Sequence, residues 1–296
     1  MLLNPAATFE LAKRVRAPEG APIGEIFAFL SGLYFRGKLA YATAFGSATD
    51  RFVITTDRGL MPRGTQAAWA MIVRTAVFDE IILDRVAAGV DCVLNLAAGL
   101  DARAWRMSSL PPTLRWIDVD LPGILDYKTD MLRDEKPVVR YEAVKVDLTD
   151  AARRRALFAQ VGAESSRVLV LSEGLLIYLT PDDVAGLARD LHDPQSFRWW
   201  VIDLASPMLL KWMSRSWGKR VDAANAPFRF APEESTKFFE PYGWREEQFR
   251  SSWLESKRLN RQMPLAWLWT LVGKLRSRQT QEGFARFSGI VLLQRT

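Results

Sequence analysis

Acidic side chains follow three apolar segments of the sequence, each at a point where a strand would end. Asp118 and Asp120 close the segment WIDVD, Asp147 follows VKV, and Glu173 follows VLVLS. In an open parallel sheet, ligands bind in the crevice beyond the carboxyl ends of the strands, and these ends lie along one edge. The pattern therefore predicts a row of carboxylates at a ligand-binding edge.

A turn rich in small residues precedes the first of these acids. Residues 94–103 read LNLAAGLDAR, where Ala97 and Gly99 would let backbone amides approach a ligand closely. Asp118 and Asp120 follow about 20 positions later, the spacing at which a carboxylate reaches ribose hydroxyls, and either residue could be that ligand. The turn lacks the pattern G-x-G-x-x-G, which disfavours a nicotinamide dinucleotide and the oxidoreductase function that would use it.

Alternating strands and helices would position these residues. Several of the strand segments are continuous apolar runs, as expected for strands that are covered on both faces. We therefore predict a doubly wound, mostly parallel α/β sheet. The predicted strands are 92–96, 114–119, 138–146, 168–172, 199–204 and 287–294, and the predicted helices are 64–89, one after 101, one from 121, 150–161 and 181–192.

The chain of 296 residues is long enough for one large α/β domain with added caps. We predict a helical N-terminal cap at 1–63, a ligand-binding core at 64–204, an inserted substrate cap at 205–282 and a closing strand of the core sheet at 283–296. The cap at 205–282 is rich in Trp, Phe and Arg.

The chain holds one cysteine, Cys92, and one histidine, His192. A single cysteine excludes an internal disulfide, and its place in an apolar strand favours an inert core thiol. A zinc site needs several Cys and His ligands together, and a histidine-dependent triad would have to use His192, which ends a predicted helix. We therefore expect no metal site and no such triad.

The N-terminal residues MLLNPAATFELAKRVR lack the basic start and the continuous apolar core of a signal peptide. No run approaches the roughly 18 apolar residues of a membrane span. We therefore expect a cytoplasmic chain without a membrane span, in which residues 263–272, MPLAWLWTLV, form a buried helix, a lid or an interfacial anchor.

Charge and aromatic residues are unevenly distributed. The net charge is +6, residues 211–296 hold 16 Lys and Arg against 8 Asp and Glu, and eight of the 11 Trp residues follow residue 198. This composition suits a small acidic or aromatic substrate, although core packing could also use the Trp residues. The basic residues are scattered, so no nucleic-acid partner is expected. The sequence does not predict the oligomeric state.

Five motifs occur in order along the chain: Arg74 on the helix before the first strand, LAAGLDAR at 96–103, VDLP at 119–122, Asp147-Leu148, and EGLLIYL at 173–179. The same motifs occur in this order in the leucine carboxyl methyltransferase family, and the chain resembles that family, including its bacterial natural-product O-methyltransferase relatives.

This resemblance implies a seven-stranded, Rossmann-like class I methyltransferase that binds S-adenosylmethionine. It implies the following cofactor contacts: Arg74 with the carboxylate, Asp120 with the ribose, Asp147 and Leu148 with adenine, Glu173 near the methionine amine, and Ala97 and Gly99 in the turn. Two positions depart from the family pattern. Ala97 replaces the first glycine of the turn, which should be tolerated if its dihedral angles are ordinary. Thr149 replaces an arginine that resembles a substrate-carboxylate clamp, which disfavours a protein C-terminal leucine as the substrate.

Methyl transfer from a sulfonium is an in-line displacement that requires an anionic or readily ionised acceptor. A carboxylate is ionised at neutral pH and needs no base, so we predict methyl ester formation on a small molecule or natural product. The alternative is methylation of a hydroxyl on an aromatic or polyketide substrate, with Tyr178 or Glu173 as the base. Tyr178 is the candidate for substrate positioning, or else a core tyrosine. A further alternative is a non-catalytic protein that binds S-adenosylmethionine.

Overall fold

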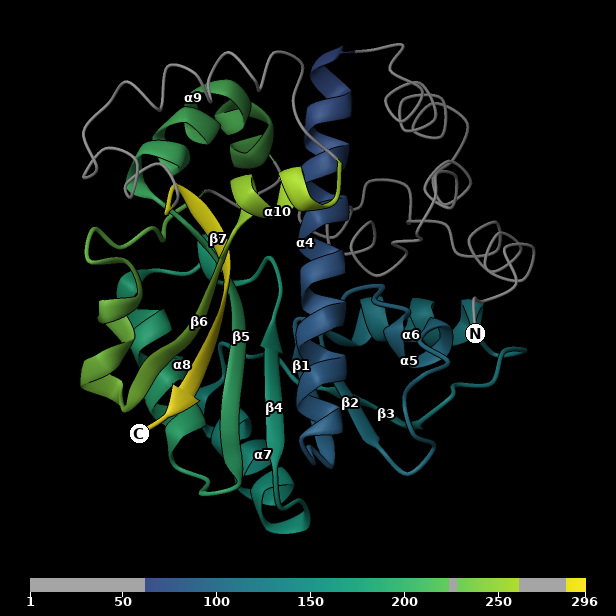
Figure 1. The fold of residues 1–296 in the computed structure, drawn as a ribbon. Helices are drawn as coiled ribbons and strands as arrows, with labels where there is room; N and C mark the ends of the chain where they lie inside the picture. The colour runs from purple at the N-terminus through teal and green to yellow at the C-terminus, as the bar shows by residue number, and fades with distance from the viewer. Residues whose placement is uncertain (1–61, 224–227, 261–285) are drawn as a thin grey trace.

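The computed structural model describes residues 62–223, 228–260 and 286–296, which form an α/β structure around one sheet (Figure 1). Seven strands lie in the order β3-β2-β1-β4-β5-β7-β6. β1 to β5 are parallel, and β7 is antiparallel to β5 and β6. The predicted mostly parallel α/β fold is confirmed. The strands are β1 (Cys92–Leu96), β2 (Arg115–Asp120), β3 (Arg140–Lys145), β4 (Val168–Ser172), β5 (Phe197–Ala205), β6 (Trp244–Ser251) and β7 (Ser288–Arg295).

Helices cover both faces of the sheet. α7 and α8 contribute side chains to one hydrophobic cluster, whereas α4 and α5 contribute to a second cluster on the opposite face. The long helix α4 runs across the front of the sheet in Figure 1. The helices are α4 (Pro62–Ala87), α5 (Arg103–Arg106), α6 (Pro122–Met131), α7 (Ala151–Glu164), α8 (Pro181–His192), α9 (Pro207–Ala223) and α10 (Ser252–Arg258), with 3-10 helices η2 (Leu176–Tyr178) and η3 (Ser235–Tyr242).

The central strands are apolar along their length because both of their faces are covered. All five residues of β1 and all five of β4 are buried. Leu94 packs in the cluster on the face that α7 and α8 cover, and its neighbour Val93 packs in the cluster on the face that α4 and α5 cover. Each such side chain contributes about 1.5–3 kcal/mol by its removal from water. The strand ends are therefore held rigidly at the edge where the acidic residues lie.

The start of α8 is fixed by its local sequence. The Thr180 hydroxyl accepts a hydrogen bond from the Asp183 amide, and the Asp183 carboxylate accepts one from the Thr180 amide. This capping box, with Pro181 in the first turn, stabilises the helix by about 1 kcal/mol. It also fixes the chain directly after η2, which carries Tyr178.

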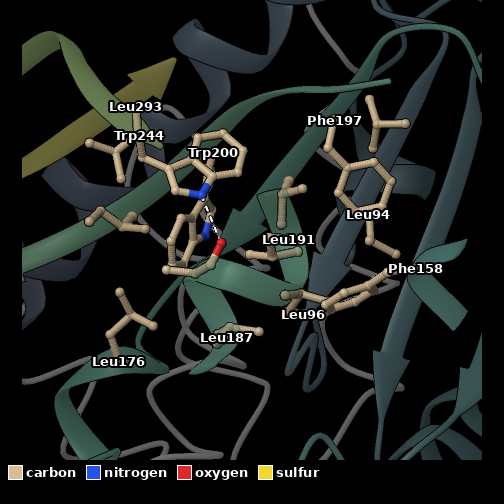
Figure 2. Packing of buried hydrophobic residues seen from close by; sticks show 14 of the residues in the cluster. Leu94, Leu96, Phe158, Leu176, Leu187, Leu191, Phe197, Trp200, Trp244 and Leu293 are labelled. Atoms are coloured by element: carbon tan, nitrogen blue, oxygen red, sulfur yellow. Dashed lines mark hydrogen bonds between the residues drawn. The ribbon is translucent and has the colours of Figure 1, made fainter. Parts of the chain in front are cut away.

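Two tryptophans, Trp200 and Trp244, pack among leucine and phenylalanine side chains in the core between the sheet and α8 (Figure 2). Trp200 and Trp244 are fully buried, and their rings meet edge to face with centroids 5.7 Å apart. The Trp200 indole donates to the Ser172 hydroxyl at 2.9 Å, and the Trp244 indole donates to the Ala188 carbonyl oxygen at 2.9 Å. These tryptophans therefore serve packing rather than substrate contact, whereas Trp212 is 57% exposed.

The structure differs from the sequence-based expectation at β6. This strand lies within 205–282, which was predicted as a substrate cap, yet residues 244–251 belong to the sheet. The sequence WREEQFRS is polar because β6 is an edge strand, and in the described part of the sheet it pairs with β7 alone. Nearly all of the predicted N-terminal cap at 1–63 and the whole apolar stretch 263–272 lie outside the described residues.

None of the helices within the described ranges combines the length and the apolarity needed to cross a bilayer. Cys92 is fully buried in β1, and burial raises the pKa of its thiol to about 11. The prediction of an unreactive core thiol agrees with this position.

His192 is the last residue of α8, and its ring packs against the start of β6. Its ring meets Trp244 edge to face at 5.9 Å, and a side chain at Gly243 would collide with it. Nε2 of His192 is buried without a hydrogen-bond partner among the described residues. Burial lowers the pKa of the ring, the nearby Arg295 guanidinium lowers it further, and Asp193 opposes both effects. The folded chain therefore favours the neutral ring.

We predict that acid destabilises the fold partly through His192. As the pH falls through about 6.5, the unfolded chain binds a proton that the folded chain takes up only at lower pH, so the free energy of unfolding decreases. Urea denaturation of the parent and of His192→Asn across this range measures the effect. The variant should show a shallower pH dependence, and identical slopes would contradict the assignment.

Candidate functional site

Arg103 lies at the centre of the carboxyl edge of the sheet. Its side chain is 1% exposed and contacts three carboxylates. Nε lies 2.7 Å from Asp79 Oδ1, Nη1 lies 2.6 Å from Asp101 Oδ2, and Nη2 lies 2.7 Å from Glu173 Oε2. Both terminal nitrogens of Arg106 also donate hydrogen bonds to the Asp79 carboxylate, each at 2.8 Å. These ion pairs join α4, the turn after β1 and the end of β4.

Arg74 continues this network toward β5. Its Nε donates to Glu173 Oε1 at 2.9 Å, and its Nη1 donates to Asp203 Oδ2 at 3.0 Å. The backbone amide of Gly174 donates to Asp203 Oδ1 at 2.7 Å. Nη2 of Arg74 is buried and has no hydrogen-bond partner among the described residues. The guanidinium of Arg74 is thus fixed on two sides and has one buried donor left.

Asp118 and Asp120 have different roles, although either could have been the ribose ligand. The Asp118 carboxylate is fully buried and accepts hydrogen bonds from Asn95 Nδ2 at 3.0 Å and from Trp116 Nε1 at 2.9 Å. It also forms a buried ion pair with Lys128. These three partners hold Asp118 inside the fold, so Asp120 is the acid that β2 presents at the edge.

Asp120 is bound to the turn after β1. Its Oδ2 accepts the Gly99 amide at 2.7 Å, and its Oδ1 accepts the Leu121 amide at 2.7 Å. Burial raises the pKa of Asp120, and these two amides partly offset that effect. The Ala98 amide also donates to the Val119 carbonyl oxygen at 3.2 Å. The small-residue turn and the end of β2 therefore form one unit.

The turn requires left-handed backbone at two positions, because φ is +50° at Ala97 and +52° at Gly99. Gly99 adopts this conformation freely, whereas Ala97 is strained in it because its Cβ atom disfavours a positive φ. The condition that Ala97 has ordinary dihedral angles is therefore not met. The chain keeps the shape of a glycine-rich turn at a cost of about 1 kcal/mol.

Asp147 and Leu148 follow the end of β3. The Asp147 carboxylate accepts the Thr149 amide at 2.9 Å and the Thr149 hydroxyl at 2.7 Å, and these bonds lower the pKa of Asp147. Thr149, the residue that departs from the family pattern, thus holds Asp147 ionised. The Val146 amide donates to the Asp120 carbonyl oxygen at 3.1 Å, which ties this segment to β2.

Tyr178 lies in η2, close enough to Arg74 and Asp203 to interact with both electrostatically. Its ring is tilted by 32° relative to the ring of Phe228, with centroids 5.7 Å apart. Burial raises the pKa of Tyr178, the Arg74 charge lowers it, and the Asp203 charge raises it. The phenol is therefore neutral at ordinary pH and can donate a hydrogen bond.

The structure brings the predicted residues together in two groups. Gly99 and Asp120 are linked directly, Ala97 lies two positions before Gly99 in the same turn, and the Val146 amide ties the segment of Asp147 and Leu148 to Asp120. Arg74, Glu173 and Tyr178 form the second group at the ends of β4 and β5. In the described ranges, no group of three or more acidic, His or Cys side chains is arranged to hold a metal ion.

Sequence reasoning missed Asp79 and Asp203. Asp203 is the one acid within the apolar run WWVIDLA of β5, a signal that could have been noticed. Asp79 lies on α4, and nothing in its local sequence distinguishes it from a surface acid. Asp101 and Arg103 were recognised as part of the turn motif, but their mutual pairing depends on the fold.

A solved structure supports the fold assignment. The crystal structure of a duf574 family protein from Streptomyces avermitilis matches with a TM-score of 0.58 and 14% sequence identity, over 93% of this chain and 98% of that one. At this identity the likeness concerns the fold alone. The match covers nearly the whole of both chains and agrees with the α/β architecture described above.

The family of the chain follows from its sequence. The family model described as leucine carboxyl methyltransferase matches residues 38–192, which is more than half of the 296 residues. The chain therefore belongs to the leucine carboxyl methyltransferase family, and the predicted Rossmann-like class I methyltransferase fold is confirmed.

Two relatives illustrate the extent of the similarity. A protein of Frankia alni is 34% identical over 151 residues, covering 50% of this chain and 52% of its own. A protein of Mycobacterium marinum is 39% identical over 132 residues, covering 43% and 39%. Both are named as proposed S-adenosyl-L-methionine-dependent methyltransferases. The chain spans about half the length, or less, of these relatives.

We predict that position 97 tolerates glycine but not a β-branched residue. Ala97→Val should lower the free energy of unfolding by about 1–3 kcal/mol, because valine cannot adopt a positive φ without strain. Ala97→Gly should change it by less than about 1 kcal/mol, since relief of strain and the greater entropy of the unfolded chain oppose each other.

Ala143→Val is the matched control, because Ala143 lies half-buried in β3, where extended backbone accommodates valine. Urea denaturation of the three variants gives the comparison. Equal stability of Ala97→Val and Ala143→Val would contradict the left-handed turn.

Proposed function

We propose that the chain is an S-adenosylmethionine-dependent methyltransferase that transfers a methyl group to an oxygen of a small molecule. The observation that carries the proposal is the carboxyl edge of the sheet, where Asp120 is bound to the Gly99 amide and Arg74 is paired with Glu173. The family membership and the names of the relatives support the same cofactor.

The chemistry of the edge fits an adenosyl amino acid. The buried Nη2 of Arg74 is a donor suited to a carboxylate. Asp120 would bind the ribose hydroxyls, and Asp147 with Leu148 would hold adenine by its amine and its face. Glu173 and the turn at Ala97 would lie beside the methionine amine. When bound, the cofactor supplies an electrophilic methyl group on a sulfonium.

We favour a carboxylate as the methyl acceptor. A hydroxyl acceptor needs a base, and the single histidine lies at the end of α8, beside the amino end of β5 and away from this edge. Glu173 is paired with two arginines, and burial raises the pKa of Tyr178. An acceptor that is already anionic, with a reference pKa near 4, needs none of these groups as a base.

Calorimetry and mass spectrometry test the proposal together. S-adenosylhomocysteine should bind the purified chain and NAD should not. With deuterated S-adenosylmethionine, a panel of aromatic and aliphatic carboxylic acids and the corresponding phenols should yield labelled methyl esters. Labelled ethers instead of esters would favour hydroxyl methylation. Binding without transfer to any compound would favour a non-catalytic role, and failure to bind the cofactor product would contradict the proposal.

Asp120→Ala should weaken S-adenosylhomocysteine binding by about tenfold or more, because it removes a charge-assisted contact of about 1.5–3 kcal/mol. Asp134→Ala, which removes an exposed acid after α6, serves as the control and should bind as the parent does. Isothermal titration calorimetry gives both constants. If Asp120→Ala binds S-adenosylhomocysteine as tightly as the parent does, Asp120 is not a cofactor ligand.

Tyr178→Phe should lower kcat/KM for the best acceptor by about 3- to 10-fold, the loss expected for one neutral hydrogen bond. The alkaline side of the pH profile should stay unchanged, because burial raises the pKa of Tyr178 above its ordinary value. Initial rates from pH 6 to about 9 measure both quantities. Loss of an alkaline or neutral ionisation in the variant would show that Tyr178 acts as a base instead.

A further inference from the structure

Asp203 links two parts of the site that come from distant segments of the chain. It lies near the carboxyl end of β5, and its side chain is 24% exposed. One carboxylate oxygen accepts the Gly174 amide and the other accepts Arg74 Nη1. The two bonds join the start of the turn after β4 to α4.

The turn at Gly174 is shaped to receive the arginine. Gly174 has a φ of +69°, and a Cβ atom there would lie 3.3 Å from Arg74 Nη1. The guanidinium therefore packs directly against the backbone that Asp203 holds. A shift of this turn would move the surface on which Arg74 rests.

Asp203 also determines the direction of the remaining donor of Arg74. The guanidinium is planar and rigid, so fixing Nε on Glu173 and Nη1 on Asp203 fixes the position of Nη2. If Glu173 were the only partner, the guanidinium plane of Arg74 could still pivot about the Nε hydrogen bond to Glu173. The second contact therefore turns a flexible cation into an oriented donor, and Nη2 is buried without a partner among the described residues.

We propose that Asp203 is a positioning residue for the amino-acid end of the cofactor: it holds Arg74 and the Gly174 turn so that Arg74 Nη2 is directed at the methionine carboxylate. This inference rests on the proposed function, because it assumes an S-adenosylmethionine site. Asp203 acts through Arg74 and does not itself bind the cofactor. The effect of its removal should therefore be limited to ligands that carry the carboxylate.

Three ligands test this limit by calorimetry: S-adenosylhomocysteine, its decarboxylated analogue, which keeps the amine, and 5′-methylthioadenosine, which lacks the amino acid. Asp203→Asn removes the charge at nearly constant shape. It should weaken S-adenosylhomocysteine by about tenfold while leaving the other two ligands within about twofold of the parent, because one charge-assisted contact is misaligned.

Glu142→Gln is the matched control, since it removes a carboxylate that pairs with Arg115 at 2.9 Å near the amino end of β3. It should bind all three ligands as the parent does. If Asp203→Asn does not fold, as judged by circular dichroism, Asp203→Glu keeps the charge but displaces it, and the same selective loss is expected.

The outcomes separate the inference from the proposed function. Parent-like binding of S-adenosylhomocysteine by Asp203→Asn would overturn the positioning role alone. Equal weakening of the decarboxylated analogue would overturn it too, because Asp203 would then contact the amine directly. Absence of S-adenosylhomocysteine binding by the parent chain would contradict the proposed function itself.

Discussion

Arg103 carries a full positive charge at a position that is 1% exposed, where water cannot solvate it. Burial lowers the pKa of this guanidinium, but Asp101, Glu173 and Asp79 raise it more, so the charge persists. Removing one partner of such a buried pair typically costs about 3–5 kcal/mol. Because the three carboxylates come from α4, the turn after β1 and the end of β4, the need to neutralise Arg103 determines how these elements meet.

Glu173 connects Arg103 to the end of the neighbouring strand β5. It shares its two oxygens between Arg103 and Arg74, and Arg74 in turn reaches Asp203 on β5. The network therefore continues across the sheet as alternating charges and leaves one buried donor of Arg74 facing no described partner. A second, independent unit is formed by Asp120 and the turn at Gly99. The proposed cofactor would bridge the two units.

Local patterns in the sequence were sufficient for most of the fold. The apolar runs of β1 and β4 indicate buried strands directly, because a strand that is covered on both faces needs apolar residues along its length. β6 was missed because an edge strand exposes polar residues and has no apolar periodicity. The order of strands likewise depends on pairing between distant segments.

The candidate site was predicted as a set of residues but not as a set of contacts. The strand-end spacing alone left Asp118 and Asp120 equivalent, and the family resemblance pointed to Asp120. The physical reason is the set of buried partners of Asp118, one of which, Lys128, is ten positions away on α6. The pairing of Arg74 with Asp203 spans 129 positions, and no local pattern predicts it. The positive φ of Ala97 was also hidden, because alanine gives no sequence signal for a left-handed turn.

A crystal structure of the chain with S-adenosylhomocysteine tests the central claim most directly. The methionine carboxylate should lie within hydrogen-bond distance of Arg74 Nη2, and the ribose hydroxyls should lie on Asp120, while Arg74 keeps its bonds to Glu173 and Asp203. A ligand bound away from this edge, or a methionine carboxylate held by other groups while Arg74 Nη2 stays unbound, would contradict the site.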